Sequence, residues 1–206
     1  MIVIIDYGMG NLRSILHKLR KMEVEGLISA RPEDVERADR LILPGVGHFA
    51  AGMENLRKSG LADALNRAVM DRGTPIMGIC LGMQLLTEHS EEGDAAGLGW
   101  VRGRTVRFNF DGAEERLRVP HVGWNLIEKK TACPLLADVA ADQRFYFVHS
   151  YYVACDRPED VAATTRYGRE FVSVVHRGHV FGTQFHPEKS HRRGIEIIRR
   201  FVGGVS

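Results

Sequence analysis

The sequence predicts an α/β fold with a mostly parallel central sheet, helices flanking that sheet, and an antiparallel β extension. In the first half, short apolar runs alternate with amphipathic segments, a pattern typical of parallel strands joined by helices. In the second half, runs rich in β-branched and aromatic residues follow one another, with glycine or aspartate turns between them. No repeat or linker-like stretch divides the chain, so residues 1–206 predict a single domain.

Four short apolar runs in the first half predict buried strands. These strands are expected at 2–5, 27–28, 41–43 and 76–79. Apolar residues at helical spacing, or an early proline, predict the helices between them. These helices are expected at 11–22, from Pro32 onward, at 49–57 and at 61–69. The last strand runs into Cys80, after which we expect a helix over 81–89.

The second half of the chain predicts further strands and one closing helix. The strands are expected at 105–110, 123–127, 145–148, 151–154, 162–166, 173–176 and 180–185. The Arg-Gly-His turn at 177–179 separates the last two strands, so we expect these two to form a hairpin. The helix is expected at 194–201, where apolar residues lie at helical spacing.

Composition excludes several classes of protein. The 206 residues carry a net charge of only +2, which does not indicate a nucleic-acid partner. No apolar run approaches the roughly 20 residues that a membrane helix needs. The cysteines Cys80, Cys133 and Cys155 are odd in number and form no C-x-x-C pair, which favours a reducing compartment over a disulfide framework or a zinc ribbon. We therefore expect a cytoplasmic protein that uses no metal and no cofactor.

The segment Gly-x-Cys-x-Gly at 78–82 lies between a predicted strand and a predicted helix. This pattern is typical of a sharp turn that lifts a nucleophile above the edge of a sheet, where flanking glycines relieve crowding. The helix N-terminus favours the reactive thiolate, and the N–H of Leu81 is well placed to stabilise an oxyanion. Taken alone, Cys80 is equally well explained as a small buried apolar residue, and Cys133 and Cys155 have no comparable setting.

A cysteine nucleophile needs a base, and the base needs a group that orients it. His186 ends a predicted strand, Pro187 stops that strand, and Glu188 is close enough along the chain to bind one imidazole nitrogen. Because the carboxyl ends of parallel strands meet at one edge of a sheet, we expect His186 to meet Cys80 there. Alone, a His-Pro-Glu segment is more often an ordinary turn, and the pattern around Cys80 is what favours a catalytic pair.

The segment Pro-Gly-Val-Gly at 44–47 follows another predicted strand. Two glycines at a strand end indicate that the backbone approaches a ligand closely. Considered by itself, the segment is better explained as an ordinary strand-to-helix turn.

Together, and in this order, these segments resemble the class I glutamine amidotransferase family. The resembling motifs cover essentially the full chain: Pro-Gly-Val-Gly-His-Phe at 44–49, Gly-Ile-Cys-Leu-Gly-Met-Gln-Leu-Leu at 78–86, Ser-Glu-Glu at 90–92, Tyr-Phe-Val-His-Ser-Tyr at 146–151 and Gln-Phe-His-Pro-Glu-Lys-Ser at 184–190. Val-Pro-His-Val-Gly-Trp-Asn at 119–125 resembles one branch of that family, the HisH-type glutaminase subunits of imidazole glycerol phosphate synthase. Val122 stands where that branch usually has methionine.

The resemblance implies a Cys-His-Glu glutaminase. In it, Cys80 attacks glutamine, His186 transfers the proton and Glu188 orients His186. The resemblance also implies oxyanion-hole donors at Gly47 and Leu81. The residues that would hold the amino-acid part of glutamine are Gln84, Glu92, Ser150 and Tyr151.

Subunits of the resembling branch join a HisF-type (β/α)8-barrel synthase. That partner consumes the ammonia and forms imidazole glycerol phosphate and AICAR in histidine biosynthesis. The partner-facing residues that the resemblance implies are Pro120, His121, Gly123, Trp124, Asn125 and Lys189. Segments 6–12, 144–153 and 188–191 also resemble paralogues that supply ammonia for sugar amidation in surface-polysaccharide pathways, so the ammonia acceptor is left open.

Two further classes of function remain as alternatives. A Cys-dependent hydrolase or chaperone with a similar fold would use Cys80 and His186 but would leave Gln84 and Glu92 unexplained. A non-catalytic binding module would not need a complete triad. Glutamine turnover with a barrel partner separates the first alternative from an amidotransferase, and labelling of Cys80 by a glutamine-like electrophile argues against the second.

Overall fold

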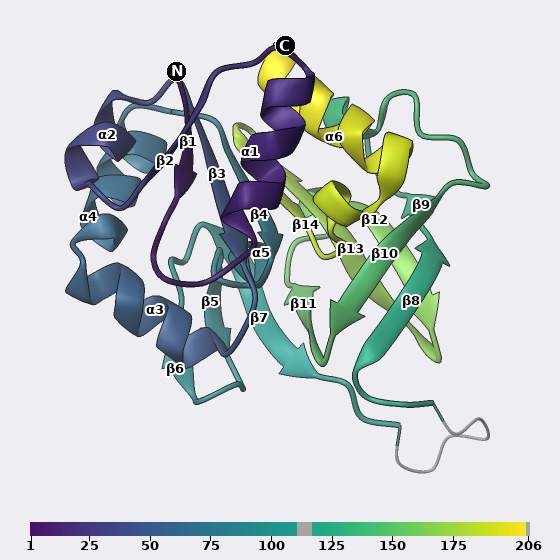
Figure 1. Cartoon of the computed structure of the whole chain (residues 1–206). Coiled ribbons are helices and arrows are strands. Elements are labelled where there is room, and N and C mark those ends of the chain that lie inside the picture. The colour runs from purple at the N-terminus through teal and green to yellow at the C-terminus, as the bar shows by residue number, and fades with distance from the viewer. Residues whose placement is uncertain (111–116, 205–206) are drawn as a thin grey trace.

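A computed structural model describes residues 1–110 and 117–204 of the chain, and one large sheet runs through it (Figure 1). The spatial order of its main strands is β2 (Gly26–Ser29), β1 (Ile2–Ile5), β3 (Arg40–Gly45), β4 (Ile76–Cys80), β14 (Val180–Thr183), β13 (Arg169–Arg177), β11 (Tyr151–Cys155), β7 (Val101–Arg107), β5 (Thr87–Ser90) and β6 (Ala95–Ala96). Strand β12 (Val161–Tyr167) pairs with β13 and with β9 (Glu128–Lys129).

The first five strands in this order are parallel to one another and lie between two helical layers. Their side chains alternate between the layers, as the pleat of a strand requires. Val3 and Ile5 pack in one core with α2 (Pro32–Arg37), α3 (Phe49–Lys58) and α4 (Leu61–Asn66), which a π-helical turn at Arg67–Asp71 extends. Ile2 and Ile4 pack in the other core with α1 (Leu12–Lys21) and α6 (His191–Gly203).

The second half of the chain is largely antiparallel. Strands β14, β13, β11 and β7 pair antiparallel in succession, and the β13–β14 hairpin turns at 178–179 as predicted. Strands β8 (His121–Leu126) and β10 (Arg144–His149) form a separate antiparallel ribbon. Short 3-10 turns lie at Pro134–Leu136, Pro158–Asp160 and Pro187–Lys189. Of the described helices, none has the length and apolar character needed to cross a membrane.

The predicted fold class is confirmed, but the predicted helix at 81–89 is wrong. Helix α5 covers only Leu81–Gln84, and β5 begins three residues later. The carbonyl oxygen of Gln84 accepts the hydroxyl of Thr87 at 2.8 Å, and Thr87 pairs with Val101 of β7. Because this pairing joins residues far apart along the chain, the local pattern of apolar residues could not reveal it.

Candidate active site

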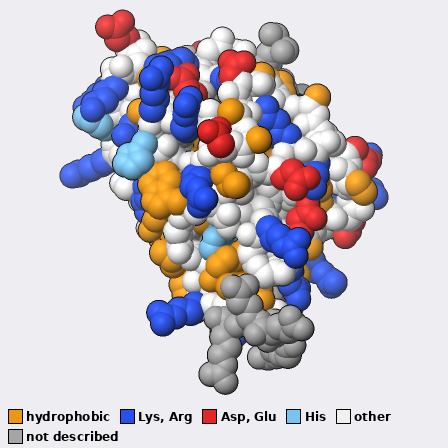
Figure 2. Space-filling view, turned by 90° about the vertical axis from the view of Figure 1, so that its right-hand side faces the viewer, with side chains coloured by type: hydrophobic (Ala, Val, Ile, Leu, Met, Phe, Trp, Pro, Cys, Tyr) orange, Lys and Arg blue, Asp and Glu red, His pale blue; other side chains and the backbone are white. Residues whose placement is uncertain are grey.

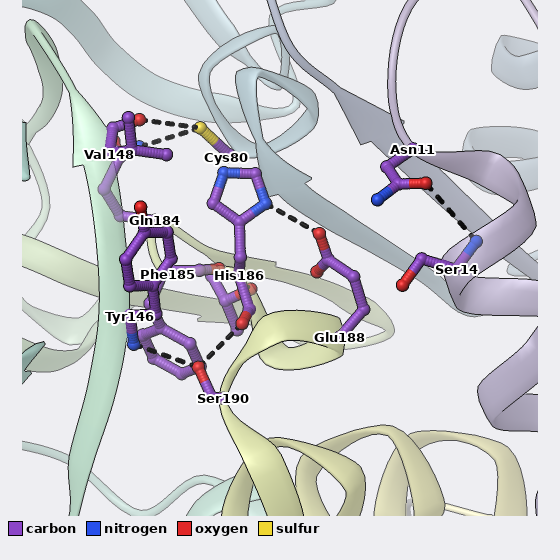
Figure 3. Close-up of polar contacts among 11 residues, drawn as sticks. Asn11, Ser14, Cys80, Tyr146, Val148, Gln184, Phe185, His186, Glu188 and Ser190 are labelled. Carbon is purple, nitrogen blue, oxygen red and sulfur yellow. Dashed lines mark hydrogen bonds and ion pairs between the residues drawn. The ribbon is translucent and has the colours of Figure 1, made fainter. Parts of the chain in front are cut away.

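The carboxyl ends of β3, β4 and β14 bring the predicted catalytic residues to one edge of the sheet. In the strand register, Cys80 at the end of β4 lies opposite Gly45 of β3, and Thr183 of β14 lies opposite Ile79. His186 follows β14 by three residues and therefore lies at the same edge. Figure 3 shows the sulfur of Cys80 above the imidazole of His186, with Glu188 on the far side of the ring.

Cys80 occupies a strained turn between β4 and α5. Its φ of 55° lies in the left-handed region, which a residue with a side chain adopts only when its surroundings hold it there. A Cβ on Gly78 would lie 2.6 Å from the carbonyl oxygen of Gly82, and a Cβ on Gly82 would collide with the carbonyl oxygen of Leu43. The two glycines of the Gly-x-Cys-x-Gly pattern therefore permit the close packing that places the buried thiol at the edge of the sheet.

His186 and Glu188 form a buried pair beside that thiol. His186 is 1% exposed and Glu188 is 5% exposed, and Nδ1 of His186 donates to Oε1 of Glu188 at 2.8 Å. The other ring nitrogen, Nε2, has no hydrogen-bond partner among the described residues and faces the thiol (Figure 3). This arrangement leaves Nε2 available to exchange a proton with Cys80 or with a bound substrate.

The protonation state of His186 suits a thiolate–imidazolium pair. Burial alone would lower the pKa of His186, but the neighbouring Cys80 thiol and Glu188 carboxylate favour the charged ring and raise its pKa to about 9. At neutral pH the imidazolium is therefore the favoured form. A cationic ring next to a thiol stabilises the thiolate, which is the nucleophilic form.

The predicted oxyanion-hole residues lie on two elements, after β3 and at the start of α5. Leu81 is the first residue of α5, so its N–H has no acceptor within the helix. Gly47 follows β3 with a φ of 130°, and a Cβ there would collide with Cε of Met9. Glu92 lies beside this segment, because its Oε2 accepts the N–H of Phe49 at 2.8 Å. A glycine is thus required at 47 by both conformation and space.

The other predicted substrate residues are already engaged in hydrogen bonds within the chain. Gln84 is buried, and its Nε2 donates both to the carbonyl oxygen of Tyr151 and to the side chain of Gln184. The carbonyl oxygen of Ser150 accepts the N–H of Phe108 at 3.0 Å. A ligand would therefore meet the side-chain oxygen Oε1 of Gln84 rather than its Nε2 hydrogens.

Known proteins provide the decisive comparison. The family model described as glutamine amidotransferase class-I matches residues 3–204. This chain belongs to the class I glutamine amidotransferase family. The resemblance predicted from the motifs is therefore confirmed, and the protein is an enzyme of that family.

Similar proteins share both the sequence and the fold of this amidotransferase. Imidazole glycerol phosphate synthase subunit HisH 2 of Pseudomonas aeruginosa is 48% identical, with 98% of each chain covered. The HisH subunit of Geobacillus thermodenitrificans is 49% identical, covering 100% of this chain and 97% of the relative. A chain in the structure of PurLQS from Thermotoga maritima has the same fold, with a TM-score of 0.71 at 19% identity over 98% of this chain and 97% of that one.

The amidotransferase exposes apolar side chains on strand β8. We define the β8 patch as Val122, Trp124, Tyr146, Lys189 and His191, which come from β8, β10, the 3-10 turn at Pro187–Lys189 and the start of α6. Trp124 is 40% exposed and stacks on His191 with ring centroids 4.9 Å apart, and Nζ of Lys189 lies 5.9 Å from the ring centroid of Tyr146. Figure 2 shows hydrophobic side chains gathered beside histidine, lysine and arginine on this side of the molecule.

His121 differs from the other predicted partner-facing residues. Pro120, Trp124 and Lys189 are exposed, whereas the side chain of His121 is buried and lies against Phe147 with ring centroids 5.0 Å apart. Strand alternation turns His121 inward when the neighbouring residue of β8 points outward. Its side chain therefore lies beneath the exposed residues of the segment, and the place of this segment at a partner interface stays a prediction.

The sequence analysis did not single out the residues that hold the triad in place. Ser190 is buried; its Oγ donates to the carbonyl oxygen of His186 at 2.7 Å and accepts the N–H of Tyr146 at 3.0 Å. Gln184 is fully buried, and its Nε2 lies 3.7 Å from Sγ of Cys80. A serine just before a helix is a recognisable N-terminal signal, but neither residue's contact with the site has a local signature.

Proposed function

We propose that this chain is the glutaminase subunit of an imidazole glycerol phosphate synthase, and that Cys80, His186 and Glu188 are its catalytic triad. The observation that carries the proposal is the buried His186–Glu188 pair with its free ring nitrogen facing Cys80. Full-length identity near 48% to HisH subunits supports the assignment to this synthase.

The proposed reaction is acyl transfer from glutamine through a thioester. The thiolate of Cys80 attacks the carboxamide carbon, and the backbone N–H groups of Leu81 and Gly47 bind the negatively charged oxygen that forms. The imidazolium of His186 donates its Nε2 proton to the leaving nitrogen, so ammonia departs and the thioester remains. His186 then takes a proton from water, the resulting hydroxide attacks the thioester, and glutamate is released.

The amino-acid part of glutamine is proposed to lie between α5 and the loop that carries Glu92. The carboxylate of Glu92 would bind the α-ammonium group, and the side-chain oxygen Oε1 of Gln84 would contribute a further acceptor. Ser150 and Tyr151 lie where β11 begins, next to these residues. Contacts through their carbonyl oxygens would compete with hydrogen bonds that exist already.

The proposed partner is a HisF-type (β/α)8-barrel that receives the ammonia. The β8 patch offers it an exposed tryptophan with a lysine nearby, and aromatic residues of this kind commonly anchor interfaces. The patch adjoins the triad, because the carbonyl oxygen of Tyr146 accepts the N–H of His186 at 2.9 Å. Pro120, Gly123, Trp124, Asn125 and Lys189 are proposed to contact the partner directly, with His121 supporting them from beneath.

We place this complex in the cytoplasm. Cys80, Cys133 and Cys155 are all unpaired, which suits a reducing compartment. The proposed substrates are small and water-soluble, and the described helices include no membrane span.

The deciding experiment reconstitutes the chain with a HisF-type partner and its nucleotide substrate. With glutamine, wild-type protein should support synthesis of imidazole glycerol phosphate, and Cys80→Ala should lower that rate at least about 10³-fold. With ammonium salt in place of glutamine, both proteins should support the same rate. Loss of both activities in an intact complex would contradict the proposal, and transfer of ammonia only to a sugar acceptor would reassign the chain to the polysaccharide paralogues.

A further inference from the structure

A buried side chain that the proposed mechanism does not use touches the nucleophile. Gln184 is fully buried between β14 and His186, and its Nε2 donates to Sγ of Cys80 at 3.7 Å (Figure 3). Its Oε1 accepts Nε2 of Gln84 at 3.1 Å, and the same Gln84 nitrogen donates to the carbonyl oxygen of Tyr151 at 2.9 Å. These three contacts join the start of β11 to the sulfur.

The orientation of both amides follows from the carbonyl at one end. A carbonyl oxygen can only accept, so the atom of Gln84 that faces Tyr151 must be its nitrogen. That nitrogen also faces Gln184, so the facing atom of Gln184 must be its oxygen. The nitrogen of Gln184 is therefore turned toward Cys80 and supplies an N–H donor to the sulfur.

The chain of hydrogen bonds continues from Tyr151 to strand β8. Nδ1 of His149 lies 2.7 Å from the carbonyl oxygen of Tyr151, and Nε2 of His149 lies 3.0 Å from Nδ1 of His121. Burial lowers the pKa of His121 to about 4 and that of His149 to about 3, so both rings are neutral. His149 must donate to the carbonyl through Nδ1, which makes its Nε2 an acceptor and His121 the donor to it.

An N–H donor on the sulfur has a direct chemical consequence. Hydrogen bonds to an ionised group favour that form over the neutral one, so this donor favours thiolate over thiol. Since the amide is buried, no solvent competes for its N–H, and the interaction is stronger than at a surface. The carbonyl oxygen of Tyr151 sets its direction through Gln84, and the hydrogen bonds of His149 and His121 hold that carbonyl in place below the β8 patch.

We propose that Gln184 is a positioning residue that stabilises the thiolate of Cys80. The carbonyl oxygen of Tyr151 sets its orientation through Gln84, and a buried pair of hydrogen bonds from His149 and His121 holds this carbonyl in place. This inference rests on the proposed role of Cys80 as the nucleophile. It adds a physical connection from the strand beneath the proposed partner surface to the sulfur. The connection requires no movement of the His186–Glu188 pair.

The first test measures the alkylation rate of Cys80 by iodoacetamide from pH 5 to pH 10 in the full chain. Gln184→Met keeps the side-chain volume and removes the N–H donor, so the midpoint of the profile should move upward by about one pH unit. The other titratable groups that face the sulfur or the ring beside it are Tyr7, after β1, His149, at the end of β10, and His186 with Glu188, after β14; the variant leaves them unchanged.

The matched control is Gln143→Met. Gln143 is a buried glutamine at the start of β10, at the opposite end of that strand from His149. Its substitution should leave the profile of Cys80 alkylation as in wild type. An unshifted profile in folded Gln184→Met, or an equal shift in Gln143→Met, would overturn the role of Gln184. If Gln184→Met does not fold, Gln184→Glu replaces it and should shift the midpoint further in the same direction.

The second test concerns His121, at the far end of the series of hydrogen bonds, and replaces it with either of two amide side chains. His121→Asn places a donor where Nδ1 of His121 lies, whereas His121→Gln places its donor nearer the position of Nε2. The Asn variant should keep the wild-type alkylation profile, and the Gln variant should shift it upward. Identical alkylation profiles for the two variants would show that His121 does not affect the sulfur through these hydrogen bonds.

These results are independent of the partner. If reconstituted glutaminase activity is present but neither test shifts the profile, the proposed function stands and this inference fails. If both tests shift the profile as expected but no glutamine is hydrolysed with the partner, the chain of hydrogen bonds stands and the proposed function fails.

Discussion

The two sides of the site differ in how firmly the chain holds them. On the base side, His186, Glu188 and Ser190 are all buried and are joined by hydrogen bonds of 2.7 and 2.8 Å. On the oxyanion side, Val46, Gly47 and His48 are exposed, and Val46 presents 49% of its surface. Strand β3 ends at Gly45, so the pairing that orders the sheet stops just before this segment.

This difference indicates which half of the chemistry is complete in the chain alone. Proton transfer needs a fixed imidazole, and the buried pair provides it. Oxyanion stabilisation needs N–H groups that point at one position. An exposed segment after a strand end has few contacts that fix the direction of its N–H groups. We expect the partner to complete the oxyanion side while the base side stays as it is.

The largest expected effect comes from the base side. Glu188→Gln keeps the shape of the orienting residue but removes its charge, so the pKa of His186 should fall below about 9. We expect kcat for glutamine hydrolysis in the complex to fall by about 10²- to 10⁴-fold, with the alkaline limb of its pH profile moved to lower pH. Glu196→Gln, on the exposed side of α6, is the control. A loss below tenfold would show that His186 does not depend on this carboxylate.

A smaller effect is expected from the oxyanion side. Gly47→Ala places a side chain at a φ of 130° and against Met9, so we expect kcat to fall by about 10- to 10²-fold. Alkylation of Cys80, which forms no oxyanion, should keep its wild-type rate. Gly99→Ala, at another left-handed glycine with open space around it, controls for backbone strain alone. Equal losses in the rates of Cys80 alkylation and of glutamine turnover would mean that Gly47 affects the reactivity of the thiol and not the oxyanion.

The effect on partner binding should be smaller again. Trp124→Ala removes an exposed ring from the β8 patch and should weaken the complex by about tenfold, a typical loss for an interface tryptophan. The free energy of unfolding should fall by only about 1 kcal/mol, because the ring is 40% exposed and packs on one side against His191 and Tyr146. Met70→Ala, at an exposed residue of the first half, is the control for titration calorimetry. Unchanged affinity in Trp124→Ala would place the interface elsewhere.

The base side should also make the stability of the folded chain depend on pH. The pKa of His186 is raised to about 9 in the folded chain, from a value near 6.5 when unfolded. Its stabilising contribution is therefore complete below about pH 6.5 and is lost as the pH rises through about 9. Urea unfolding at pH 6 and pH 9 should show a smaller loss of stability in Glu188→Gln than in wild type. Equal losses of unfolding free energy in the two proteins would mean that groups other than His186 control stability between pH 6 and pH 9.

The sequence revealed the parts of the site that have local signatures. The glycines around Cys80 are such a signature, and Cys80 lies between β4 and α5 as predicted. His186 was predicted to end a strand, but β14 ends three residues earlier, at Thr183. Gln184, His149 and Ser190 were not found, because their contacts join β14 to β4, β8 to β10, and β10 to α6. The helix predicted over 81–89 failed for the same reason, since β5 exists only through pairing with β7.

The central claim is that Cys80 is the single nucleophilic cysteine of this glutaminase, and covalent labelling tests it most directly. Burial raises the pKa of Cys133 to about 11 and that of Cys155 to about 12, so neither is expected to react near neutral pH. Treated with a diazoketone analogue of glutamine and mapped by mass spectrometry, the complex should carry one adduct, on Cys80, that forms more slowly when glutamine is present. An adduct on Cys133 or Cys155 with Cys80 unmodified would contradict the account.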